Sequence, residues 1–153
     1  MKIKAILVTI LIFAAANFCT AQTATDSIKQ VINNMFAAMK DGDTLKLKSC
    51  FSETAILQTF GRIQEGAVVI KTESVSDFCR IIGSLPKGAA DEQIVFKDIK
   101  VDGAMASVWA PFKLYFNGSF YSCGVNSIQM ANLNGQWKIQ YIIDTRRKDN
   151  CVE

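Results

Sequence analysis

The first strong periodic pattern of the chain lies in residues 26–40. Its apolar side chains recur at intervals of three and four residues, which is the spacing of one helical face: Ile28, Val31, Ile32, Met35, Phe36 and Met39. Thr25 or Asp26 can cap the start of this helix, and the Asp-Gly-Asp turn at residues 41–43 ends it. The pattern therefore predicts an amphipathic helix that needs an apolar partner surface.

Two shorter helices are predicted further along. Leu47, Cys50 and Phe51 mark the first of them. Ser74 and Asp77 form a capping-box pattern, and apolar residues follow at helical spacing over residues 75–85. The next break is the stretch from Gly83 to Pro86, so we expect the third helix to end there.

Strand patterns fill most of the remaining sequence. Residues 53–60 and 67–72 are two runs rich in strand-forming residues. Four longer runs follow at residues 92–101, 104–116, 119–132 and 136–145, separated by the dipeptides Asp-Gly, Asn-Gly and Asn-Gly. These dipeptides favour tight hairpins, so the last four runs predict an antiparallel meander. Pro111 within the second of these runs indicates a bulge or an edge position.

The order of these elements predicts an α+β fold. Three amphipathic helices must cover one side of a sheet, and long strands must curve to meet them. We therefore expect a half-cone, a curved mixed sheet packed by about three N-terminal helices. This domain spans residues 22–147, and residues 148–153 form a C-terminal tail.

The first 21 residues have the pattern of a secretory signal peptide. Lys2 and Lys4 precede an apolar run, and small residues lead to a cleavage position after Ala21. The run is too short to span a membrane comfortably, so we expect a periplasmic or secreted protein with no transmembrane span in its mature form. A minor alternative is a lipoprotein attached through Cys19. Without the signal the charge is nearly balanced, and no basic cluster indicates nucleic-acid binding.

The composition limits the chemistry of the chain. It has no histidine, which removes the commonest general base and neutral metal ligand. Beyond the signal, four cysteines remain, at positions 50, 79, 123 and 151. In an exported protein they permit disulfides, and the pairing stays open among three full connectivities. We expect no metal and no cofactor.

Two stretches carry a resemblance to a known superfamily. FAAMKDGDTLKLKSCFSETAILQTFG follows the first helical pattern, and NLNGQWKIQYIIDTRR lies near the end. Together they resemble the nuclear transport factor 2-like superfamily, nearest to its polyketide-cyclase-like and lumazine-binding bacterial members, over residues 25–147. The resemblance implies a half-cone with a covered concave face. The superfamily hosts isomerases, dehydratases, cyclases and transport adaptors, so the fold alone assigns no activity.

Ketosteroid isomerase is the well-understood enzyme of that superfamily. Its tyrosine donor aligns with Met35, its aspartate base with Thr59, and its protonated aspartate with Asn126. A methionine has no useful donor, and a threonine hydroxyl is no base near neutral pH. Asn126 can still donate a hydrogen bond. We therefore do not expect that specific activity.

Alternation along the strands, oriented by the resemblance, predicts a ligand-binding set on the concave face. This set comprises Phe112, Asn126, Gln140, Ile142 and Asp144. A structural role is the alternative: Asn126 and Gln140 would satisfy buried backbone groups, and Asp144 would pair with Arg146 or Arg147. We favour pairing for Asp144. If the protein is an enzyme, Asp144 is the candidate catalytic base.

The same alternation predicts an aromatic outer face made of Trp109, Tyr115, Trp137, Ile139 and Tyr141. Such a face is too apolar to remain exposed, and a sheet-to-sheet homodimer is the favoured interpretation. The leading functional hypothesis is an exported, non-catalytic protein that binds a small hydrophobic ligand. The alternatives are an enzyme of proton transfer or dehydration, and a protein-interaction module that uses the outer face.

Overall fold

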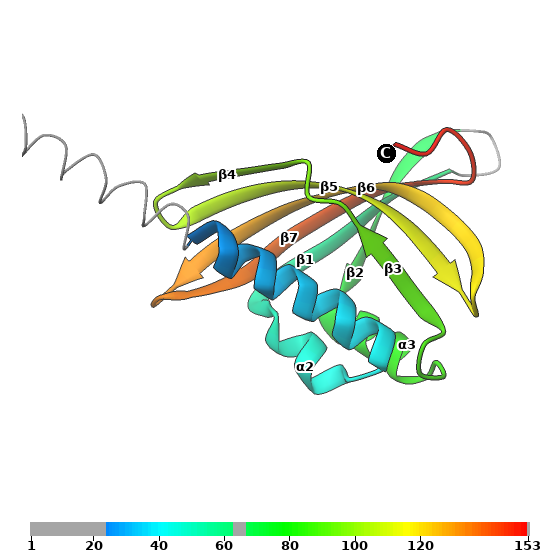
Figure 1. Ribbon diagram of the computed structural model, residues 1–153, viewed down its shortest axis with the longest axis horizontal. Coiled ribbons are helices and arrows are strands. Elements are labelled where there is room, and N and C mark those ends of the chain that lie inside the picture. Colours follow the sequence, from blue (N-terminus) through cyan, green and yellow to red (C-terminus); the bar gives the residue numbers. More distant parts are fainter. Residues whose placement is uncertain (1–23, 63–66, 153) are drawn as a thin grey trace, which may run out of the picture.

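The computed structural model describes residues 24–62 and 67–152, so the predicted signal peptide lies outside the described part. A long helix over residues 24–41 comes first (Figure 1). The other elements follow in the order α2 (Thr44–Ser49), β1 (Phe51–Arg62), β2 (Val68–Ser74), α3 (Val75–Gly83), β3 (Ala90–Ile94), β4 (Asp98–Asp102), β5 (Met105–Phe116), β6 (Ser119–Leu133) and β7 (Gln136–Arg147).

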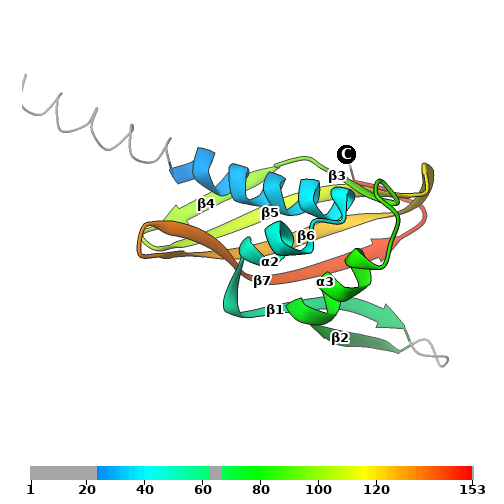
Figure 2. The ribbon, with the colours of Figure 1, turned by 90° about the horizontal axis from the view of Figure 1, so that it is seen from below.

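The strands form one mixed sheet in the order β2-β1-β7-β6-β5-β3, and β4 pairs with β5 as well. β1 and β7 run parallel, whereas the other pairs are antiparallel. The three helices lie on one side of this curved sheet (Figures 1 and 2). The predicted α+β half-cone is therefore confirmed.

The core lies between the helices and the inner face of the sheet. Ile28, Ile32, Leu47 and Ile82 come from the helical side, and the sheet contributes Val108, Ile128 and Ile139. The caps form as predicted at α3, where Ser74 Oγ accepts a hydrogen bond of 3.0 Å from the Asp77 N–H. Phe51, predicted to end the second helix, instead begins β1 and packs edge-on against Phe78.

The predicted hairpins are confirmed. Asn117 and Gly118 both have positive φ angles, and so do Asn134 and Gly135. Two successive residues with positive φ define the turn type that matches the twist of paired strands. These turns set the pairing of β5 with β6 and of β6 with β7.

The prediction of a single strand over residues 92–101 was wrong, because the structure has two strands there, β3 and β4. The break lies opposite Pro111 of β5, whose carbonyl accepts a 2.9 Å hydrogen bond from the Val95 N–H. Proline has no N–H to return that bond, so the regular antiparallel ladder is interrupted there.

The predicted outward orientation of Trp137 and Ile139 was also wrong. Met130 of β6 pairs with Ile139 of β7, whereas its neighbour Gln129 pairs with Tyr141, so the register skips one residue of β7. Gln140 is the extra residue of this bulge, and an extra residue reverses the alternation of side chains. Trp137 is 6% exposed and Ile139 is 0% exposed, and both belong to the core.

Candidate ligand-binding site

A cavity of about 590 Å³ lies among the helix over residues 24–41, α3 and the inner face of the sheet. Its apolar lining includes Met35, Phe36, Met39, Leu57, Phe78 and Ile142. The strand register places Leu57 beside Ile142, and the next inward pair along the same strands is Thr59 beside Asp144. The lining therefore changes from apolar to polar within one step along β1 and β7.

Asp144 is held by two partners at this polar end. The Arg146 guanidinium donates to both carboxylate oxygens, with an Nε–Oδ1 distance of 3.1 Å and an Nη2–Oδ2 distance of 2.8 Å. The Thr59 hydroxyl donates to Asp144 Oδ1 as well. Burial lowers the pKa of Arg146, but the hydrogen bond and the charge of Asp144 outweigh burial, so the pKa lies above its ordinary value. The predicted pairing of Asp144 with Arg146 is confirmed.

Glu92 is a second carboxyl group at the polar end. Its Oε1 accepts a hydrogen bond of 2.8 Å from Asn126 Nδ2. Glu92 lines the cavity, and within the described residues its other carboxylate oxygen has no hydrogen bond. Burial, reinforced by the negative charge of Asp144, raises the pKa of Glu92 to about 7, although the hydrogen bond from Asn126 opposes this rise.

Further charged groups line the cavity on β2 and α3. Burial raises the pKa of Glu73, and the nearby charge of Arg146 partly offsets this rise. Asp77 forms a 3.0 Å ion pair with Arg80, and the hydrogen bonds from Arg80 and Ser74 lower the pKa of Asp77. In this second group Asp77 and Arg80 neutralise each other, whereas Lys71 and Glu73 of β2 form no ion pair within the described residues.

The structure brings three of the five predicted ligand-binding residues to the cavity. Asn126, Ile142 and Asp144 line it. Gln140 and Phe112 do not belong to its lining. Gln140 accepts a 2.7 Å hydrogen bond from the Ser52 hydroxyl and donates to the Thr54 carbonyl, which is the structural alternative weighed from the sequence.

Phe112 is buried on the inner side but packs beside Gly124, where an added Cβ would lie 2.9 Å from Phe112 Cε1. The residue that sequence reasoning missed is Glu92. A signal for it was present, because Glu92 and Ile94 are two residues apart on one strand and therefore share a face, and Ile94 is an apolar residue that favours the inner one.

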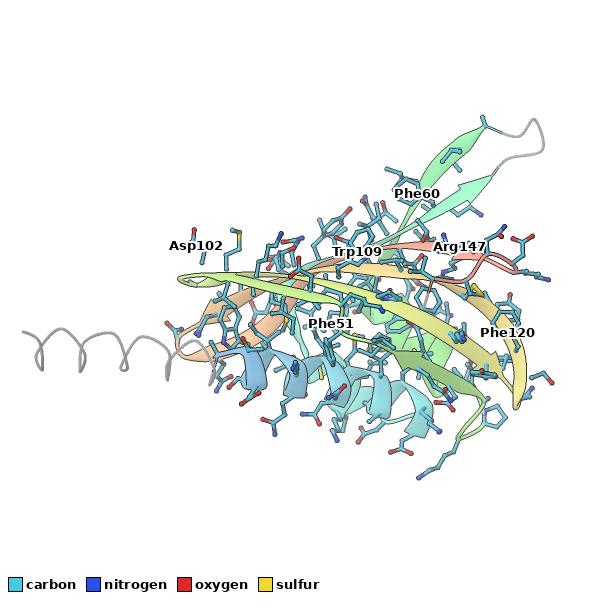
Figure 3. The ribbon with its side chains drawn as sticks, turned by 45° about the horizontal axis from the view of Figure 1, so that its top comes forward. Phe51, Phe60, Asp102, Trp109, Phe120 and Arg147 are labelled. Carbon is cyan, nitrogen blue, oxygen red and sulfur yellow. A yellow bond between two sulfur atoms is a disulfide. The ribbon has the colours of Figure 1, made fainter. Side chains whose placement is uncertain are left out.

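The outer face of the sheet keeps part of its predicted aromatic character. Trp109 is 50% exposed and Phe60 is 41% exposed, and both lie on the side away from the helices, whereas Phe51 points between the sheet and the helices (Figure 3). These two residues line a shallow hollow of about 300 Å³ together with Val125, Ser127, Ile143, Asp144, Thr145, Arg147 and Val152.

The other predicted outer residues have local partners. The Tyr141 hydroxyl donates a 2.6 Å hydrogen bond to Gln58 Oε1, and Tyr115 packs edge-on against Phe120. One disulfide joins Cys123 of β6 to Cys151 of the tail, which resolves the pairing left open by the sequence. Cys50 and Cys79 are free and buried.

No protein-family model matches the sequence, and no curated protein sequence matches it. Solved structures do match the fold. An NTF2-like protein of unknown function from Shewanella baltica OS155 superposes with a TM-score of 0.66 and 14% identity, covering 83% of this chain and 96% of that one. An NTF2-like protein of unknown function from Silicibacter pomeroyi DSS-3 gives a TM-score of 0.65 and 15% identity, covering 83% and 98%.

A protein of unknown function with a cystatin-like fold from Nostoc punctiforme gives a TM-score of 0.63 and 9% identity, covering 80% of this chain and 90% of that one. At these identities the likeness is one of fold. The chain has the nuclear transport factor 2-like fold that the sequence predicted.

Two further properties concern membranes and metals. Among residues 24–62 and 67–152, no helix is both long and apolar enough to cross a membrane. Within the same ranges, the acidic and cysteine side chains nowhere form a group of three that could hold a metal ion.

Proposed function

We propose that the protein binds a small molecule with an apolar body in the cavity of the half-cone and does not transform it. The observation that carries this proposal is the cavity itself, which is about 590 Å³ in volume and combines apolar side chains with a set of polar and charged ones. Small-molecule sites typically combine a hydrophobic lining with a few convergent polar groups. The resemblance to the polyketide-cyclase-like and lumazine-binding bacterial members is consistent with this use of the cavity.

Acid–base catalysis is the second candidate, and one observation favours it. Glu92 lines the cavity and has a pKa of about 7, which suits a group that accepts or donates a proton at neutral pH. Asp144, the candidate base from the sequence, has both oxygens hydrogen-bonded to Arg146 and one to Thr59. If there is catalysis, Glu92 therefore replaces Asp144 in that role.

Filling the cavity tests the proposed function. Leu57→Trp places a larger side chain in the cavity and should reduce binding of a small aromatic probe at least about tenfold, because the probe and the indole compete for the same space. Binding is measured by isothermal titration calorimetry.

Ile56→Trp is the matched control, because Ile56 is the neighbouring residue of the same strand, is 45% exposed and does not line the cavity. Equal losses in the two variants would contradict binding in the cavity. A ligand recovered chemically changed by the wild type, but unchanged by Glu92→Gln, would favour the catalytic candidate.

We also propose that the protein acts outside the cytoplasm, after removal of residues 1–21. The Cys123–Cys151 disulfide supports this proposal, because disulfides persist mainly in oxidising compartments. Intact-mass measurement on exported protein should give a chain that begins at Gln22. A chain that retains residues 1–21 would contradict it, and a lipid on Cys19 would favour the lipoprotein alternative.

The outer face is proposed to join two copies of the chain. A two-fold interface must be complementary to itself, and the exposed apolar side chains of Phe60, Ile70 and Trp109 can meet their own copies across such an interface. We expect the wild type to sediment as a dimer at high micromolar concentration and Trp109→Lys to sediment as a monomer.

Leu45→Lys serves as the control for this experiment, because Leu45 is 84% exposed on α2, on the helical side of the sheet. It should leave sedimentation unchanged. A wild type that stays monomeric would count against the dimer and favour the alternative that this face binds another protein.

A further inference from the structure

The charged groups around the cavity are unevenly balanced. Arg146 interacts electrostatically with three carboxylates, those of Asp144, Glu92 and Glu73. All of its hydrogen bonds to carboxylates go to Asp144. One cation therefore stands among three potential anions, and two of those anions have no ion pair within the described residues.

Two other cations, Arg80 and Lys71, line the cavity, but neither forms an ion pair with Glu92 or Glu73 within the described residues. Arg80 pairs with Asp77 on the same helix. Lys71 is exposed, and its side chain lies over Gly61, where an added Cβ would be 2.9 Å from Lys71 Cε. The pKa of Glu92 responds to burial, to the amide of Asn126 on β6, and to Asp144 and Arg146 on β7.

Glu92 has a geometry suited to meeting a ligand. One oxygen accepts a hydrogen bond from Asn126, which orients the carboxyl group, and the other has no hydrogen bond within the described residues of the cavity lining. The apolar and aromatic side chains of Phe36, Leu57 and Phe78 line the same cavity. An oriented acceptor next to an apolar wall fits a molecule that has one charged donor and a hydrophobic body.

We infer that the cavity selects a small organic cation, in which a protonated nitrogen on an apolar or aromatic body meets Glu92 and gains additional attraction from Glu73. This inference rests on the proposed function and adds the chemical class of the ligand. A nitrogen cation supplies the ion-pair partner that Glu92 lacks within the described residues, and aromatic faces such as those of Phe36 and Phe78 also attract cations. The described carboxylates are not grouped as metal ligands, so the apolar lining indicates an organic cation.

An anionic ligand fits this site less well. To reach Arg146, it would have to displace Asp144 from a two-pronged ion pair and then stand near Glu92 and Glu73. A neutral ligand would avoid that repulsion but would leave the two carboxylates without a counter-charge. The order of affinity expected from these charges is cation, then neutral molecule, then anion.

The test uses three probes with one aromatic body: 1-naphthylmethylammonium, 1-naphthylmethanol and 1-naphthoate. Calorimetry on the mature wild type at pH 8 should show the ammonium binding about tenfold more tightly than the alcohol, and the carboxylate binding most weakly. Glu92→Gln should bring the ammonium to the affinity of the alcohol while leaving the alcohol unchanged. Glu53→Gln is the matched control, because Glu53 is exposed and lies outside the cavity.

The pH dependence provides a second measurement. Because Glu92 has a pKa of about 7, it loses its charge as the pH falls. Affinity for the ammonium should therefore rise several-fold from pH 6 to pH 8 in the wild type, and this rise should be much smaller in Glu92→Gln. Glu92→Gln should remain folded at pH 8, since its side-chain oxygen can still accept the bond from Asn126 and no charge is buried.

The possible outcomes separate the two proposals. If the three probes bind equally well and Leu57→Trp blocks them all, the cavity is a binding site but its preference for cations is refuted. If the carboxylate binds most tightly, the preference is refuted as well. If no probe binds, or if Leu57→Trp changes nothing, both the proposed function and this inference fail.

Discussion

Replacing Gly124 with alanine is expected to destabilise the protein by about 3 kcal/mol. Gly124 lies on β6 between Phe112 of β5 and Arg146 of β7. A Cβ at this position would be 1.7 Å from the carbonyl oxygen of Thr145, far inside any permitted contact. That oxygen belongs to the backbone of a central strand, so no side-chain rotation can relieve the clash, and β7 must move away from β6.

Gly61→Ala is the matched control for this prediction. Gly61 is also in a strand, and its added Cβ would meet only the flexible end of the Lys71 side chain. We expect this variant to change stability by no more than about 0.5 kcal/mol. Urea unfolding monitored by tryptophan fluorescence compares the two, and similar losses in both variants would contradict the close approach of β6 and β7.

The close pairing of β6 and β7 at Gly124 also positions residues of the candidate site. Asn126 follows Gly124 by two residues on β6, and the pair Asp144 and Arg146 lies opposite on β7. Any displacement of β7 would therefore separate Asp144 from Asn126 as well as loosen the sheet. A loss of probe binding in Gly124→Ala is expected to accompany its loss of stability.

The helices and hairpins could be predicted because their signals are local. The apolar face of residues 26–40, the cap at Ser74 and the Asn-Gly turns each depend on residues within a few positions of one another. These signals were sufficient for the order of elements, and the order was sufficient for the half-cone.

The bulge at Gln140 could not be predicted, because its cause is not local. Gln140 bonds to Ser52 and Thr54, nearly ninety residues earlier, where β1 is itself irregular between Phe51 and Ile56. Strict alternation therefore placed Asp144 and Ile142 correctly but reversed Trp137 and Ile139, which precede the bulge.

The site was predicted in part for a similar reason. Asn126, Ile142 and Asp144 were found because they lie on the last two long strands, to which the alternation was applied. Glu92 lies on β3, which had been joined to β4 as one strand and was not assigned a face. The imbalance of charge in the cavity depends on the pairing of β3 with β5, which brings Glu92 to Asn126.

The tail is attached to the outer face of the sheet by the disulfide between Cys123 and Cys151. Cys123 is completely buried, and the tail residue Val152 contributes to the hollow beside Trp109. A further contact is a 3.0 Å hydrogen bond from Arg147 Nε to the Asn150 carbonyl. That contact is local and exposed, so the disulfide provides most of the attachment.

Loss of this disulfide is expected to cost about 3.5 kcal/mol and to lower the melting temperature by about 10 °C, because it closes a loop of 28 residues and restricts the unfolded chain. Cys151→Ser is the appropriate variant, since replacing the buried Cys123 would also disturb packing. A reducing agent should destabilise the wild type to the level of Cys151→Ser and leave that variant unchanged.

The tail lies on the face opposite the cavity, so Cys151→Ser should bind 1-naphthylmethylammonium as the wild type does at a temperature where both are folded. A variant as stable as the wild type would show that the β6–β7 pairing holds the tail without the disulfide, and weaker probe binding by the folded variant would show that the two faces are coupled.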